Sequence, residues 1–237
     1  MIDSAKLSKI VDIDDLVTWP DEVVEFIETQ SQIFDLGKDS YMSAGNRVLA
    51  GLFDSSFILV YHATRLLPHE IDDIRANGLK ILTEELIEKK IREAVHYEYL
   101  PKEIGEELRD GSTFKTRAKE KRANQICVVL GKSAFVNKVS SLRPLFGIWG
   151  GETINKTIVG LKYRSILTEI GEPAVLKTLL PITGDSHLDE EFLLTLTFIR
   201  AFKNKAPVGS IHWKDRSIQG QYILDILKPA DMTNQKA

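Results

Sequence analysis

The sequence has one cysteine, Cys127, among 237 residues. A single thiol excludes a disulfide framework and any cysteine-based zinc cluster. Cys127 lies in the apolar run Ile126–Leu130, so we expect a small buried side chain rather than a reactive thiolate. No stretch approaches the roughly 18 apolar residues of a membrane span, and no apolar leader precedes a cleavage site near Met1. We therefore expect a cytoplasmic protein that does not contact a membrane.

The sequence also lacks a strong excess of charge. The 31 Lys and Arg residues nearly balance 34 Asp and Glu residues, which gives a net charge of −3. Overall charge therefore does not hold the chain to nucleic acid or membrane, although a local basic patch is compatible with this balance. The run from Lys115 to Arg122 is such a patch. We interpret it first as a solvated face and second as a phosphate-facing loop, with Arg122 as the candidate nearest the following strand.

Several common catalytic signatures are missing. There is no G-x-S-x-G elbow, no Walker loop and no G-x-G-x-x-G fingerprint, so nothing supports a serine hydrolase, a nucleoside triphosphatase or a Rossmann dehydrogenase. His69, His96, His187 and His212 are scattered and show no metal-ligand spacing, so we propose no metal site.

What is present is typical of a globular protein, with 43% apolar and 8% aromatic residues. The length favours one large domain with a smaller appendage. Pro20 and the acidic residues after it predict a helix start, so we expect residues 1–50 to form a helical segment. Residues 51–228 would form the main α+β domain, and residues 229–237 a polar, flexible tail.

The clearest local pattern begins at Phe57. Residues 57–61 are β-branched or aromatic and predict a buried strand. Extended at period two, one face carries Ile58, Val60, His62 and Thr64, and therefore ends in two polar side chains. Because buried polar groups need partners, a ligand at the strand end is one explanation. A satisfied histidine at the rim of the core is the other.

A short helix follows this strand. Pro68 suits its first turn, and Gly78 suits a left-handed ending after which Leu79 packs on Ile74. Farther along we expect solvated helices over residues 84–110 and a strand over 126–130. A helix from Thr153 to about Ile170, a strand over 174–182 and a last strand over 218–227 follow. The run 192–199 fits a strand or a helix.

The residues Tyr61-His62-Ala63-Thr64, followed by Glu70-Ile71, Ile74 and Gly78-Leu79, resemble the first motif of the ADP-ribosyltransferase superfamily. This superfamily includes diphtheria-toxin-like and PARP-like enzymes, DarT DNA modifiers and RNA 2′-phosphotransferases. The resemblance covers residues 61–79. It implies a split, strongly bent β-sheet that clasps NAD in a cleft. His62 would hydrogen-bond a ribose hydroxyl, Ala63 would contact the nicotinamide amide through its backbone, and Thr64 would support the strand end.

The resemblance also implies a glutamate that engages the ribose while the nicotinamide bond breaks. Glu152 is the first candidate, because the glycines before it permit close approach, and Glu172 and Glu191 are reserves. A first-turn glutamate facing the helix dipole is an equally good interpretation of Glu152. Trp149 fits either stacking on a nicotinamide, adenine or substrate base, or a place in the core.

The resulting hypothesis is an NAD-dependent ADP-ribosyltransferase. The acceptor would be a protein side chain, a nucleic-acid base or 2′-phosphate, or water. The size suits a toxin or phage-defence effector with an antitoxin or activator protein as partner. One alternative is an RNA 2′-phosphotransferase, in which Arg65, Arg122 or Arg143 would converge with His62. The other is a non-catalytic module that binds a nucleotide or a protein.

Overall fold

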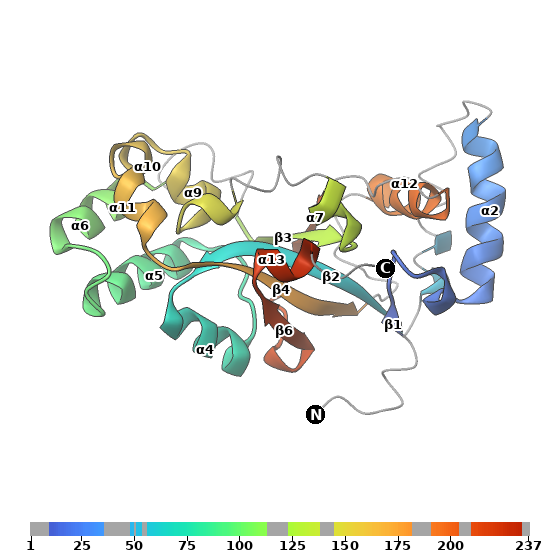
Figure 1. Cartoon of the computed structure of the whole chain (residues 1–237), viewed down its shortest axis with the longest axis horizontal. Coiled ribbons are helices and arrows are strands. Elements are labelled where there is room, and N and C mark those ends of the chain that lie inside the picture. The colour runs from blue at the N-terminus through green and yellow to red at the C-terminus, as the bar shows by residue number, and fades with distance from the viewer. Residues whose placement is uncertain are drawn as a thin grey trace.

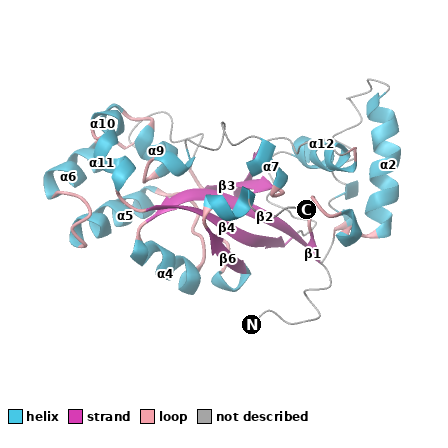
Figure 2. Cartoon of the chain, in the orientation of Figure 1, coloured by secondary structure: helices cyan, strands magenta, loops and turns pink. Residues whose placement is uncertain are grey.

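The computed structural model describes residues 10–35, 48–49, 51–53, 56–112, 123–137, 145–181, 191–203 and 210–233. In these residues the chain is a mixed α+β protein built on an open six-stranded sheet with helices around it (Figures 1 and 2). Its strands are β1 (Ile10–Val11), β2 (Phe57–Leu66), β3 (Gln125–Leu130), β4 (Glu172–Pro181), β5 (Ser210–Lys214) and β6 (Ile223–Leu227).

Helices surround the sheet at both ends and on both faces. They are α2 (Asp21–Asp35), α4 (Pro68–Asn77), α5 (Glu84–His96), α6 (Lys102–Asp110), α7 (Ser133–Asn137), α9 (Gly151–Asn155), α10 (Ile158–Lys162), α11 (Arg164–Glu169), α12 (Glu191–Phe202) and α13 (Pro229–Thr233), with 3₁₀ turns η1 (Leu16–Thr18) and η5 (Gly220–Tyr222). Among the described residues, every helix is too short or too polar to cross a bilayer.

Strand β2 is the centre of the sheet. The strand order is β5-β3-β2-β4-β6, and β1 pairs with the start of β2 in parallel. Antiparallel pairing of β2 with β4 runs along all of β2, from Phe57 opposite Pro181 to Leu66 opposite Glu172. The ladder between β2 and β3 is much shorter, since it pairs Val60 with Leu130 and Tyr61 with Val129. Strand β3 then pairs with β5 from Gln125 to Val129.

His62 therefore lies where β2 and β3 stop pairing. The strand end expected at His62 and Thr64 lies farther along, because β2 continues through Leu66. The extension exists because β4 supplies a hydrogen-bonded neighbour on that side for the whole length of β2. The expected alternation is confirmed: Ile58 and Val60 belong to one core cluster, and Phe57 and Tyr61 to the cluster on the opposite face.

Two clusters of apolar side chains sandwich the sheet. On one face, the side chains that pack with β2 come from α2 and α12, and the cluster contains Val23, Ile27, Phe198 and the β2 residues Ile58 and Val60. On the other face, Phe135 of α7 and Met232 of α13 pack with its odd-numbered residues. The N-terminal helix thus shares its core with the main sheet, and part of the expected tail forms helix α13, because Met232 is buried there.

A separate cluster of apolar side chains lies among α5, α6, α9, α10 and α11, to the left in Figure 1. The helices expected over residues 84–110 are α5 and α6. The single helix expected from Thr153 to Ile170 is three short helices. Thr157 causes one break, because its hydroxyl accepts a hydrogen bond from the Gly160 amide (2.8 Å) and so starts α10.

Helix α4 follows β2 as expected and ends at Gly78. Its Gly78 has φ 79° and ψ −177°, so the backbone leaves the helix extended rather than in a left-handed turn. Leu79 then pairs with Ile218 in an antiparallel bridge. Leu79 still packs against the cluster that contains Ile74. The run 192–199 is helical and lies within α12, and β6 is shorter than the strand expected over 218–227.

Candidate functional site around His62

The His62 side chain bonds to β3 just beyond the last pair of the β2–β3 ladder. Its Nδ1 lies 2.7 Å from the carbonyl oxygen of Cys127. A carbonyl accepts only, so Nδ1 carries the proton and Nε2 is left as a hydrogen-bond acceptor. Nε2 has no hydrogen-bond partner among the residues that the structure describes, and His62 is partly exposed. The ring is therefore fixed in orientation and tautomer, and Nε2 is left as a hydrogen-bond acceptor.

His62 is held in its neutral form. Burial lowers the pKa of the imidazole below its ordinary value, and the positive charge of Lys90 acts in the same direction. The hydrogen bond to the Cys127 carbonyl acts against these two effects, and the net direction is downward. At neutral pH the open Nε2 is thus an acceptor for a hydrogen bond, not a cation.

The two residues after His62 lie on opposite faces of β2. Thr64 shares the face of His62, is partly exposed and lies opposite Ala174 of β4. Ala63 is buried in the cluster on the other face, so its backbone rather than its side chain is placed beside the site. The structure therefore brings His62 and Thr64 together on one face of one strand.

A buried carboxylate lies next to this strand. Glu70 of α4 is 6% exposed, and its Oε2 accepts hydrogen bonds from the Leu67 amide (2.7 Å) and from Trp149 Nε1 (2.9 Å). Its Oε1 forms an ion pair with Lys90 Nζ of α5 at 2.8 Å. The same ammonium lies 6.0 Å from the centre of the Trp149 ring. We call Glu70, Lys90 and Trp149 the buried ion-pair unit.

Glu70 is ionised in this unit. Burial acts to raise the pKa of its carboxyl, but the Lys90 charge and the hydrogen bonds from Leu67, Lys90 and Trp149 outweigh burial and lower the pKa below its ordinary value. Lys90 remains 23% exposed. Because its charge also acts on His62, Lys90 lies within electrostatic reach of both the buried carboxylate and the open imidazole nitrogen.

Trp149 belongs to the core. Its residue is 0% exposed, and its indole nitrogen is satisfied by Glu70. Of the two interpretations of Trp149, the structure places the ring in the apolar cluster of α5, α6 and α9. It is covered on all sides and offers no face on which a nicotinamide, adenine or substrate base can stack.

Of the three candidate glutamates, only Glu172 has a side chain that the structure describes. The backbone of Glu152 belongs to α9, but its side chain lies outside the described part of the structure, as does that of Glu191 at the start of α12. Glu172 begins β4 opposite Leu66, with a side chain 73% exposed and 3.7 Å from Lys228 Nζ. It thus lies on a strand adjacent to His62 but four residues along the ladder from Leu176, which pairs with His62.

The candidate arginines do not gather at His62 in the part of the chain that the structure describes. Arg65 faces away from His62, and its Nε donates to the Ile170 carbonyl (2.7 Å) while Nη1 donates to that of Phe146 (3.1 Å). Arg122 and Arg143 lie outside the described residues. Within the described ranges, no group of three or more His, Cys, Asp or Glu side chains is placed to hold a metal ion.

Sequence reasoning missed Lys90 and the Cys127 carbonyl. Cys127 was expected to matter only as a buried side chain, and it is partly exposed. The sequence does show that Glu70 stands three residues after Leu67, where it can cap the start of α4. Nothing in the local sequence indicates that Glu70 also contacts Lys90 and Trp149.

Searches of protein-family models, curated proteins and solved structures return no match for this chain, so its proposed function is based on the geometry around His62 and the resemblance of residues 61–79.

Proposed function

We propose that the chain is an NAD-dependent ADP-ribosyltransferase whose dinucleotide is gripped by His62. The observation that carries the proposal is the bond from His62 Nδ1 to the Cys127 carbonyl at 2.7 Å. It holds a neutral ring, with Nε2 as an acceptor, just beyond the last β2–β3 pair. A fixed acceptor of this kind suits a ribose hydroxyl, which can donate one hydrogen bond.

Two further features support this proposal. The short β2–β3 ladder, which ends at Tyr61, is compatible with the split sheet that the resemblance implies. Lys90 places a partly exposed ammonium near His62, where it would favour the phosphates of an incoming dinucleotide.

In the proposed reaction, the bond between the nicotinamide nitrogen and the ribose carbon breaks, and nicotinamide leaves with the bonding electron pair. The ribose carbon gains oxocarbenium character, and an acceptor nucleophile then forms the new bond and loses its proton. His62 would orient the ribose by accepting from its hydroxyl. A carboxylate close to the ribose would stabilise the developing positive charge, and Glu152 and Glu172 are the candidates.

The test is NAD binding and nicotinamide release by the purified chain. We expect His62→Ala to weaken NAD binding by about tenfold or more, because one fixed hydrogen bond of roughly 1–2 kcal/mol is lost. His96→Ala is the matched control, since His96 lies at the exposed end of α5. Undetectable NAD binding by the wild type would refute the proposal, and binding without nicotinamide release would favour a non-catalytic module.

A further inference from the structure

Strand β6 forms one edge of the sheet (Figure 1). It pairs with β4 along one side, and it pairs with no other strand that the structure describes. Leu224 is 37% exposed and Asp225 is also exposed, so this strand reaches the surface. The unpaired N–H and C=O groups of an edge strand are a template on which another chain can add a strand.

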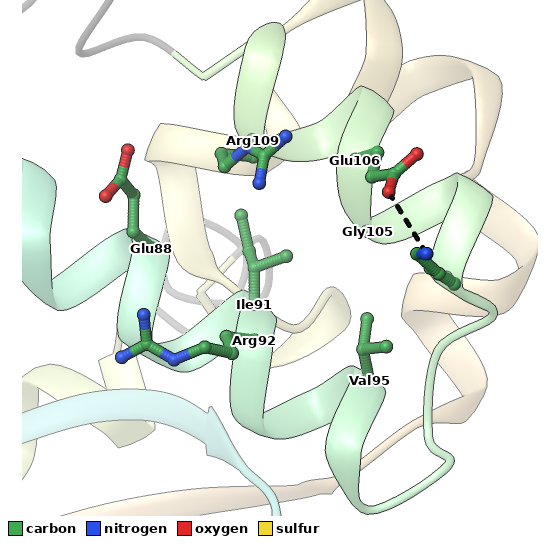
Figure 3. A pocket seen from close by; sticks show the side chains of 8 residues that line it. Glu88, Ile91, Arg92, Val95, Gly105, Glu106 and Arg109 are labelled. Carbon is green, nitrogen blue, oxygen red and sulfur yellow. Dashed lines mark ion pairs between the residues drawn. The ribbon is translucent and has the colours of Figure 1, made fainter.

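The Asp225 carboxylate bonds to the backbone of its own strand and not to a basic side chain. Lys177 lies opposite Asp225 on β4, yet no ion pair joins Asp225 to any residue that the structure describes. The surface around the pocket between α5 and α6 differs, because there Lys102 and Glu106 form an ion pair of 3.9 Å (Figure 3). Asp225 Oδ1 instead accepts a hydrogen bond from the Ile226 amide at 2.8 Å.

The Ile226 amide faces the open side of β6. Along an antiparallel pair, the N–H groups of successive residues point alternately toward the partner strand and away from it. An amide that donates to the Asp225 carboxylate does not donate to β4, so Ile226 belongs to the outward set. Asp225 therefore occupies a donor that an added strand would need.

The sequence of β6 would otherwise suit pairing with itself. Its five residues, Ile-Leu-Asp-Ile-Leu, are aliphatic except for Asp225. In an antiparallel pair with a second copy centred on Asp225, aliphatic side chains would face aliphatic side chains at the other four positions. The two Asp225 carboxylates would lie directly opposite each other, and like charges in that position destabilise the pair. A register shifted by two residues would instead place each carboxylate against an aliphatic side chain.

We propose that Asp225 keeps the open edge of β6 closed to a strand from a second copy of this chain. Its charge repels the same residue of the second copy, and its oxygen occupies the Ile226 amide. A register shift between β4 and β6 leaves Leu224 without a partner on β4, and such irregularities also protect an edge. Strand β4 separates this edge from β2, and the proposal does not depend on the proposed NAD site.

Sedimentation of the full-length chain across protein concentrations tests the proposal. We expect the mass of one chain for the wild type. Asp225→Val removes both the charge and the acceptor, and it should raise the association constant for a dimer by about tenfold or more. Asp225→Asn removes only the charge and should associate less strongly than Asp225→Val but more strongly than the wild type. Asp72→Val is the matched control, since Asp72 is an exposed carboxylate on α4 outside the sheet, and it should behave like the wild type.

A second substitution assigns the association to β6. Leu224→Lys added to Asp225→Val restores a charge at the edge and should return the mass to that of one chain. In Asp225→Val, hydrogen exchange of the Ile226 amide should be slower at high than at low protein concentration, because an added strand would then accept from it. Thermal unfolding of each variant shows whether the fold is kept. Asp225→Asn, which keeps the shape of the side chain, carries the test if Asp225→Val does not fold.

The proposal would be overturned if Asp225→Val and Asp225→Asn both kept the mass of one chain, or if Asp72→Val associated as strongly as they do. Association that persists after Leu224→Lys is added would also overturn it, because the contact would then lie elsewhere. A wild-type dimer that Leu224→Lys dissociates would refute it as well, since the edge of β6 would then be open to a second copy.

Discussion

Replacing Glu70 tests the buried ion-pair unit directly. In Glu70→Ala, the Leu67 amide and the Trp149 indole nitrogen lose their acceptor, and both residues are 0% exposed. Each buried donor left without a partner costs about 1–3 kcal/mol, so we expect the free energy of unfolding to fall by about 3–5 kcal/mol. The Lys90 ammonium adds less, because it is 23% exposed and can turn toward water.

Glu70→Gln separates charge from shape. The amide oxygen still accepts a hydrogen bond, so we expect a smaller loss of about 1–3 kcal/mol from the ion pair. Because the pKa of Glu70 lies below its ordinary value in the folded state, its stabilisation is present above the unfolded-state pKa. It is lost as the pH falls through the folded-state pKa. The difference between wild type and Glu70→Gln should therefore shrink at acid pH.

Urea unfolding of both variants measures these changes. Glu103→Ala is the matched control, since Glu103 is an exposed carboxylate in the first turn of α6, and it should change stability by no more than about 0.5 kcal/mol. A loss below about 1 kcal/mol in Glu70→Ala would refute the reasoning, because the two buried donors would then have found other partners. The reasoning would also be refuted if the difference in the free energy of unfolding between wild type and Glu70→Gln did not vary with pH.

Two further predictions concern single positions. Gly78→Ala should destabilise the chain by about 2–5 kcal/mol in urea unfolding, since φ is 79° and the new Cβ would lie 1.9 Å from the Ile218 carbonyl oxygen. Gly147→Ala, where a Cβ meets nothing within 4 Å, should be close to neutral, and equal effects would contradict this. NAD binding measured by calorimetry should be constant from about pH 8 to pH 7 and weaken as the pH falls through the lowered pKa of His62, because protonated Nε2 no longer accepts. Weakening that begins above pH 7 would contradict the neutral acceptor.

Local patterns were enough to predict β2 and α4. Alternation in β2 and the signals at Pro68 and Gly78 act over a few residues, and they placed His62 and Thr64 on the correct face. Strand β5 was missed because it has five residues and depends on its partner, with Trp213 opposite Ile126. Helix α13 was missed because its formation depends on tertiary packing, in which Met232 reaches the core.

The candidate site was predictable only in part. His62 itself could be selected, but its position within β2 depends on which neighbours pair with that strand, and β4 and β3 lie far along the chain. Lys90 is one of several basic residues on an exposed helix, and nothing in its local sequence indicates that its ammonium meets a buried carboxylate. Trp149 fitted two interpretations equally, and only its packing distinguishes them.

The ladders around β2 determine when a growing chain acquires this site. Cys127 follows His62 by 65 residues, and the strand that pairs with His62 on its other side continues to Pro181. A polypeptide released before β4 is made would therefore have the histidine but neither the register nor the closed core around it. The geometry around His62 can therefore form only after β4 has been synthesised.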